Sequence, residues 1–184
     1  MIADLHHPTI ILITGNMAAG KSTIAQALAE RLPKSVHLRG DLFRRMIVNG
    51  QVPMGFDLNE EAVAQLNLRY AIATTVASMY LAAGFTVIYQ DIIIGATLAE
   101  LVEKLRPVGL HVVVLCPDVA TIAEREARRA KQGYGSAAEI GFFDDVLRQE
   151  TPRIGFWLDT STLTVKESVD QILANLASAA ISNK

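Results

Sequence analysis

Residues Gly15 to Ser22 read GNMAAGKS and match the pattern G-x-x-x-x-G-K-[ST] at every defined position. This pattern is the signature of a loop that binds phosphate groups, the P-loop. The apolar run Thr9–Thr14 precedes it and predicts a buried strand, and the stretch Lys21–Leu32 that follows predicts a helix. A strand, this loop and a helix in that order are the context that supports the motif.

The loop carries the groups that bind a nucleoside triphosphate. Gly15 and Gly20 allow backbone angles and close approaches that a side chain would block. The main-chain amides then turn inward and form an anion site with the positive end of the following helix dipole. Lys21 is expected to reach the β- and γ-phosphates, and the Ser22 hydroxyl to ligate Mg²⁺ between them. The residues expected to bind ATP here are Gly15, Asn16, Met17, Ala18, Ala19, Gly20, Lys21, Ser22 and Thr23.

Short β-rich runs alternate with longer helical stretches along the chain. The strand candidates are Thr9–Thr14, Ser35–Arg39, Phe85–Gln90, His111–Leu115 and Gly155–Asp159. The helix candidates are Lys21–Leu32, Asn59–Ala83, Thr97–Arg106, Ala120–Lys131, Ala137–Arg148 and Val165–Ala180. Because several strands are apolar at consecutive positions, helices are expected on both faces of a parallel sheet. The alternation predicts an α/β fold with a doubly wound, parallel five-stranded sheet in one domain, residues 1–184.

Composition restricts the classes of partner. Lys and Arg number 17 against 19 Asp and Glu, a formal net charge of −2. Proteins that bind nucleic acid usually carry a basic excess, so we expect no nucleic acid partner. The one cysteine, Cys116, excludes an internal disulfide and fits a reducing compartment. No signal peptide or membrane segment is evident in the sequence, which predicts a cytoplasmic protein without a membrane partner.

Two carboxylates follow predicted strands, at the edge of the sheet where doubly wound folds bind ligands. Asp91 comes directly after Phe85–Gln90, the position of an acid that holds Mg²⁺ directly or through water. Asp41 follows Ser35–Arg39 and is placed to face an acceptor, orient its hydroxyl and take the proton. A helix N-cap for Asp41 and an ordinary strand end for Asp91 are the structural alternatives.

The region 41–84 is unusually long between two strands and is expected to bind the acceptor. Arg44 and Arg45 lie one turn after Asp41, where they either bind an anionic acceptor or pair with nearby acids. Arg69 lies in an otherwise apolar helix and is expected to line the same pocket.

The region 123–152 is rich in charge and is expected to form a lid. Its helix carries Arg125, Arg128 and Arg129 together with acidic residues. One interpretation is a solvated face with ordinary ion pairs, each of which contributes little stability. The favoured interpretation is a lid that stabilises charge on a transferred phosphoryl group. Arg153 is a further candidate for contact with the phosphates or the base.

The P-loop, the segment Arg39-Gly40-Asp41 and the arginine-rich helix resemble the small P-loop kinases, above all the chloramphenicol phosphotransferase-like proteins. Adenylylsulfate, gluconate and shikimate kinases are wider relatives. The resemblance implies a P-loop nucleoside triphosphate hydrolase fold with strand order 2-3-1-4-5 and a mobile lid. Several relatives carry Asp-Gly-Asp where this chain has Arg39-Gly40-Asp41, so Mg²⁺ is expected to depend more on Ser22 and on water held by Asp91.

The same resemblance implies ATP- and Mg²⁺-dependent transfer to a small hydroxylated acceptor, with Asp41 contacting or deprotonating that acceptor. It implies that Arg125 packs on adenine, that Arg128 or Arg129 reaches the phosphates, and that the loop around Thr160 borders the adenine. The predicted function is therefore an ATP-dependent small-molecule kinase. Its expected catalytic residues are Lys21, Asp41, Arg128 and Arg129.

Two other functions are compatible with a P-loop: a regulatory NTPase and a non-catalytic ATP-binding module. The sequence has no Asn-Lys-x-Asp motif for reading guanine, which argues against a GTPase switch. The complete Lys21-Ser22 pair and both acids argue against a purely structural use of ATP.

Overall fold

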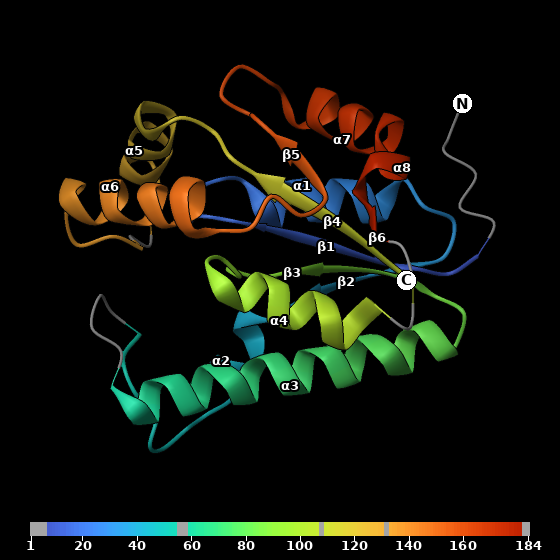
Figure 1. Cartoon of the computed structure of the whole chain (residues 1–184), viewed down its shortest axis with the longest axis horizontal. Helices are drawn as coiled ribbons and strands as arrows, with labels where there is room; N and C mark the ends of the chain where they lie inside the picture. The colour runs from blue at the N-terminus through green and yellow to red at the C-terminus, as the bar shows by residue number, and fades with distance from the viewer. Residues whose placement is uncertain (1–6, 55–58, 107–108, 131–132, 182–184) are drawn as a thin grey trace.

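The computed structural model describes residues 7–54, 59–106, 109–130 and 133–181. A sheet in the order β2-β3-β1-β4-β5 forms its centre, and a sixth strand pairs with β4 outside this path (Figure 1). The strands are β1 (Ile10–Gly15), β2 (Ser35–Arg39), β3 (Thr86–Gln90), β4 (Leu110–Leu115), β5 (Phe156–Leu158) and β6 (Ala180–Ile181). The first five pair in parallel, so the expected doubly wound topology is confirmed.

Helices cover both faces of this sheet (Figure 1). The described helices are α1 (Lys21–Glu30), α2 (Asp41–Arg45), α3 (Glu60–Ala82), α4 (Ala96–Leu105), α5 (Val119–Ala127), α6 (Ala137–Asp145), α7 (Val165–Ala174) and α8 (Leu176–Ala179). A π-helical turn, η2 (Val146–Glu150), follows α6. Within the described ranges, none of these helices has both the length and the apolar character that crossing a bilayer requires.

Alternating side chains of the central strands divide the core into two layers. Ile10 and Leu12 of β1 pack in a cluster with side chains of α3 and α4. Ile11 and Ile13 point to the other face and pack with side chains of α1, α7 and α8. All residues of β1 are buried, because a central parallel strand with helices on both faces has no side exposed to water.

The chain after β5 differs from the expectation of one helix over Val165–Ala180. Helix α7 ends at Ala174, and the side-chain amide of its C-cap residue, Asn175, donates a hydrogen bond of 2.8 Å to the Gln171 carbonyl oxygen. Asn favours such local bonds to the backbone, which compete with helix continuation. After the short α8 the chain becomes extended, and β6 pairs antiparallel with the start of β4. The single-helix prediction is therefore wrong.

The carboxyl ends of the parallel strands meet at one edge of the sheet and position the P-loop there. Gly15, the last residue of β1, has a φ of 137°, which L side chains rarely adopt. A Cβ at this residue would lie 2.3 Å from the Leu115 carbonyl oxygen of β4. Only glycine allows β1 to end so close to β4.

The same close approach recurs at Gly155, and it predicts a loss of stability in Gly155→Ala. Its φ is 73°, and a Cβ there would lie 2.3 Å from the Val112 carbonyl oxygen. Because backbone would have to shift, we expect the free energy of unfolding to fall by about 2 kcal/mol or more in urea titrations. The matched control is Gly141→Ala in α6, where a Cβ meets nothing within 4 Å. It should raise helix stability by up to about 1 kcal/mol, and equal effects of both variants would contradict the prediction.

Candidate functional site

The P-loop connects β1 to α1 and, after Gly15, contains two further residues with positive φ. Gly20 has a φ of 94°, and Ala18 has a φ of 59°, the one positive value among the described residues other than glycine. The Ala19 amide donates to the Asn16 carbonyl oxygen at 3.2 Å and closes the turn. The loop thus ends directly at the N-terminus of α1, whose free amides and dipole favour an anion.

The Lys21 side chain folds back under this loop. Its ammonium donates hydrogen bonds to the carbonyl oxygens of Gly15 at 2.8 Å and Asn16 at 2.7 Å. Burial lowers the pKa of Lys21 to about 7, and the charge of Asp91 only partly offsets this effect. The guanidinium of Arg129 contributes to this lowering, after burial. Part of the Lys21 population is therefore uncharged near neutral pH, and a phosphate group bound in the loop would favour the uptake of a proton by this lysine.

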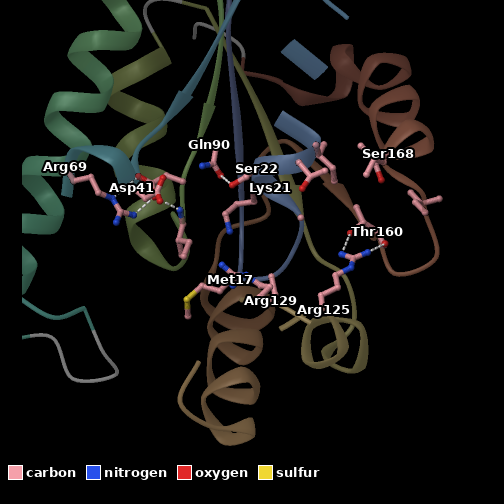
Figure 2. Close-up of a pocket in the computed structure, with 18 residues that line it drawn as sticks. Met17, Lys21, Ser22, Asp41, Arg69, Gln90, Arg125, Arg129, Thr160 and Ser168 are labelled. Carbon is pink, nitrogen blue, oxygen red and sulfur yellow. Dashed lines mark hydrogen bonds and ion pairs between the residues drawn. The ribbon is translucent and has the colours of Figure 1, made fainter. Parts of the chain in front are cut away.

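A cavity of about 520 Å³ opens in front of the loop. Figure 2 shows Asp41 and Arg69 on one side of Lys21, and Arg125 and Thr160 on the other. The structure thus brings together most of the sequence-predicted site residues. Those that line the cavity are Met17, Ala18, Gly20, Lys21, Ser22, Thr23, Asp41, Arg69, Asp91, Arg125, Arg129 and Thr160.

The residues around Ser22 fit a magnesium ion that is held mainly by phosphate oxygens and water. Ser22 Oγ lies on the cavity wall, 3.4 Å from Oε1 of Gln90. Within the described parts of the chain, no three His, Cys, Asp or Glu side chains gather as a metal cage. Mg²⁺ in nucleotide sites usually keeps several waters and takes one or two protein ligands, so a hydroxyl and a nearby amide oxygen suit it.

Asp91 lies at the cavity, but its carboxylate is already occupied. Arg69 Nε donates to Oδ2 at 3.0 Å, Arg69 Nη2 bonds Oδ1, and the Ile92 amide donates to Oδ1 at 2.8 Å. Asp91 is 3% exposed, and a Cβ at Gly40 would lie 1.9 Å from its Oδ2. The carboxylate is thus enclosed by α3 and the β2–α2 turn. The sequence predicted that Asp91 holds Mg²⁺ either directly or through water. Direct contact would require breaking the Arg69–Asp91 pair, whereas contact through water would not.

Asp41 is the more accessible acid. It starts α2, its side chain is 33% exposed, and Arg45 donates to its Oδ2 at 2.6 Å. Its Oδ1 lies 3.8 Å from Arg39 Nε and, among the described residues, accepts no hydrogen bond. Oδ1 is therefore a buried acceptor without a hydrogen-bond partner in the described part of the chain, while the Asp41 side chain as a whole lines the cavity.

The predicted acceptor-binding arginines have partners within the protein. Arg45 pairs with Asp41, which is the alternative to anion binding that the sequence left open. Arg44 Nη2 donates to the Val52 carbonyl oxygen at 2.9 Å. Arg69, as described above, holds Asp91. All three arginines are therefore already bonded to oxygens of the protein.

Arg125 closes the far end of the cavity. Its Nη2 donates to the Thr160 carbonyl oxygen at 2.7 Å, and its Nη1 lies 3.3 Å from the Ala19 carbonyl oxygen. The apolar side chains of Leu163 and Val165 line the cavity near Thr160. A flat guanidinium beside an apolar wall is a surface that suits a planar base.

The remaining predicted arginines differ in placement. Arg129 lines the cavity and pairs with Glu126 at 2.7 Å. Arg128, predicted beside it, is 77% exposed and pairs with Glu124 on the outer side of α5. Arg153 lies 4.0 Å above the ring of Trp157, in a cation–π contact. Of these three, the structure brings only Arg129 into the cavity wall.

Sequence reasoning missed Gln90 and Glu126. Gln90 is a polar residue at the end of β3, directly before Asp91, and this position was the signal that could have identified it. Glu126 looks like one of several acids on a charged helix, yet it is buried. Its burial depends on the fold of residues 133–134, which no local pattern reveals.

Comparison with solved structures gives the same fold. The chain is similar to the Mycobacterium tuberculosis APS kinase in complex with AMPPNP and APS, at a TM-score of 0.68 and 18% identity over 94% of this chain and 99% of that chain. It is similar to a sugar kinase from Janibacter sp. HTCC2649, at a TM-score of 0.67 and 17% identity over 94% of this chain and 96% of that chain. It is also similar to the Deinococcus radiodurans tunicamycin resistance protein, at a TM-score of 0.66 and 21% identity over 96% of this chain and 99% of that chain. The resemblance to small P-loop kinases is confirmed at the level of the fold.

A similar chain also occurs in the Pnkp1/Rnl/Hen1 RNA repair complex, with a TM-score of 0.63 and 18% identity over 86% of this chain and 51% of that chain. The expectation that nucleic acid is excluded as a partner is therefore not supported.

Sequence comparison places the chain in a family. No curated protein matches it. The family model described as AAA domain matches residues 10–152, which is more than half of the chain and includes the P-loop, Asp41 and Asp91. The chain therefore belongs to the AAA domain family.

Proposed function

We propose that the protein is an ATP-dependent phosphotransferase that moves the γ-phosphoryl group to a hydroxyl of a small molecule. The observation that carries the proposal is the single cavity that joins the P-loop lysine, Lys21, to the accessible carboxylate of Asp41. A P-loop alone serves binding, whereas an acid across the cavity from it offers a place for an acceptor hydroxyl.

Each group has a role that follows from its position. The P-loop amides and Lys21 would bind the β- and γ-phosphates, and Arg129 would stabilise charge on the transferred group. When bound, Mg²⁺ would neutralise charge on the phosphate oxygens, with the Ser22 hydroxyl as its protein ligand. The Asp41 carboxylate would accept the hydrogen bond of the attacking hydroxyl and take its proton as the phosphate transfers.

Asp41 suits the acceptor role better than Asp91. Asp91 is buried and both its oxygens accept from Arg69, so it has little capacity for a new hydroxyl. Asp41 lines the cavity with a side chain that is 33% exposed and accepts one hydrogen bond from the described residues, that of Arg45 to Oδ2, so its carboxylate has capacity for a further donor. The pairing with Arg45 thus orients the proposed base.

Lys21→Ala is expected to weaken the affinity for Mg·ATP by roughly 10- to 100-fold, because a charged hydrogen-bond donor to the phosphates is lost. Isothermal titration measures this directly. The matched control is Lys104→Ala, which removes an exposed lysine from the last turn of α4. Wild-type affinity in Lys21→Ala would contradict the proposed phosphate site.

The lowered pKa of Lys21 predicts a pH dependence of nucleotide binding. In the empty site its pKa is about 7, and bound phosphate would raise it. At pH 6 the ammonium is already charged, whereas at pH 8 binding must add a proton. Affinity should therefore fall by up to about tenfold per pH unit above pH 7. Titrations at several pH values should show this slope in the wild type and lose it in Lys21→Ala; a flat wild-type profile would refute the assignment.

Asp41→Asn is expected to lower phosphotransfer by about 100-fold or more while Mg·ATP affinity stays within about twofold of wild type. Transfer is detected as a mass shift in a panel of hydroxylated small molecules, with a 5′-hydroxyl oligoribonucleotide included. Glu103→Gln, an exposed acid on α4, is the matched control. Near-full transfer by Asp41→Asn would remove the proposed base, and tight ATP binding with no transfer to any acceptor would favour the non-catalytic alternative.

A further inference from the structure

A buried carboxylate lies just outside the cavity, at the end of α5. The Glu126 side chain is 7% exposed, whereas that of Glu124, two residues earlier on the same helix, is 61% exposed. Burying an ionised carboxylate is costly unless donors surround it. The hydrogen-bond donors around Glu126 therefore indicate its role.

Three donors meet on the Glu126 carboxylate. Its Oε1 accepts from the main-chain amides of Gly133 and, at 3.1 Å, Tyr134. Its Oε2 accepts from Nη1 of Arg129 at 2.7 Å. Burial alone would raise the pKa of Glu126, but the Gly133 amide and the Arg129 guanidinium hold it below its usual range. The acid is thus ionised and joins the end of α5 to a turn seven residues further along the chain.

This turn is packed directly on the P-loop. The Tyr134 hydroxyl donates to the Met17 carbonyl oxygen at 3.2 Å, and Tyr134 is 6% exposed. Its ring packs against Phe143, with the ring centroids 5.8 Å apart. At Gly133 an added Cβ would lie 2.8 Å from Met17 Sδ, so the turn and the loop are in close contact. The position of Glu126 is therefore fixed relative to the P-loop.

Arg129 is the partner that faces the cavity. Its side chain is 42% exposed, and it lines the same cavity as Lys21. Figure 2 shows its side chain between Met17 and Arg125, close to the loop. An arginine this exposed would sample many rotamers unless one partner held it. The Glu126 carboxylate is that partner.

We propose that Glu126 is a positioning residue that holds the Arg129 guanidinium at the γ-phosphate end of the cavity, using the Tyr134–Met17 contact as its anchor to the P-loop. The inference rests on the proposed function in one respect: the cavity must bind a nucleoside triphosphate. It does not require that any acceptor be phosphorylated.

Glu126→Gln should disrupt the contact with Arg129 and keep the contact with the amides of residues 133–134. Glutamine keeps one acceptor oxygen for the amides of Gly133 and Tyr134, but its NH₂ group would face Arg129, donor against donor. The readout is the ratio of affinities for Mg·AMPPNP and Mg·ADP in isothermal titration, because only the first nucleotide has a third phosphate. Both Glu126→Gln and Arg129→Ala should lower this ratio roughly tenfold.

The double variant distinguishes positioning from a general loss of structure. If Glu126 acts through Arg129, Glu126→Gln with Arg129→Ala should be no worse than Arg129→Ala alone. Effects that multiply, or a wild-type ratio in Glu126→Gln, would overturn the proposal. Glu124→Gln, which removes the exposed pair with Arg128 on the same helix, is the matched control and should leave the ratio unchanged.

The wild-type chain provides a test that needs no variant. Hydrogen exchange should show the amides of Gly133 and Tyr134 protected, since both donate to a buried carboxylate. Exchange at the rate of a free amide would overturn the proposal even if Glu126→Gln fails to fold. If wild type distinguishes AMPPNP from ADP but transfers phosphate to no acceptor, the proposed function fails and this inference stands.

Discussion

A buried ammonium group, folded onto the carbonyl oxygens of its own loop, is the interaction on which the rest of the site depends. Lys21 satisfies the Gly15 and Asn16 carbonyls, and its burial brings its pKa to about 7. The loop therefore has this geometry without a bound nucleotide, and near neutral pH only part of the Lys21 population is protonated. The doubly wound sheet makes this possible because it ends β1 beside β4 without any side chain at Gly15. The close approach of the β1 and β4 backbones at Gly15 is thus the feature of the fold that places the P-loop and Lys21.

Each arginine that lines the cavity around Lys21 is held by an oxygen of the protein. The arginines differ in whether that partner is charged and in whether they still reach the cavity. Arg69 saturates Asp91, a buried pair whose loss would leave an uncompensated charge. Arg129 is held by Glu126 and still reaches the cavity. Arg125 is held by the Thr160 carbonyl oxygen, an uncharged partner. Asp41, whose Oδ1 accepts no hydrogen bond from the described residues, also lines the cavity. The arrangement is mostly preorganised, which is what catalysis by positioning and electrostatics requires.

The parts that could be predicted from sequence are those encoded locally. The P-loop, the buried strands and the placement of Asp41 and Asp91 at strand ends follow from motif, hydropathy and topology. The Arg69–Asp91 pair joins residues 22 positions apart, and its geometry depends on how α3 crosses the end of β3. The family resemblance likewise left Arg128 and Arg129 as equal candidates, because the buried partner of Arg129 is visible only once residues 133–134 have folded onto Glu126. The local sequence pattern identifies the residues with charged or reactive side chains. Tertiary contacts determine which of these side chains remain available to a ligand.

The short strand β6 has a consequence for solution behaviour. It pairs with Leu110 and His111, while β5 pairs with β4 from Val113 onward. Since β1 occupies the other side of β4, the two short strands share its outer edge, β6 along Leu110 and His111 and β5 along Val113 to Leu115. Exposed strand margins recruit other chains into intermolecular sheets. Strand β6 thus covers a stretch of the β4 edge that β5 leaves open, at the end of the sheet remote from the cavity, and so leaves less unpaired edge for another chain.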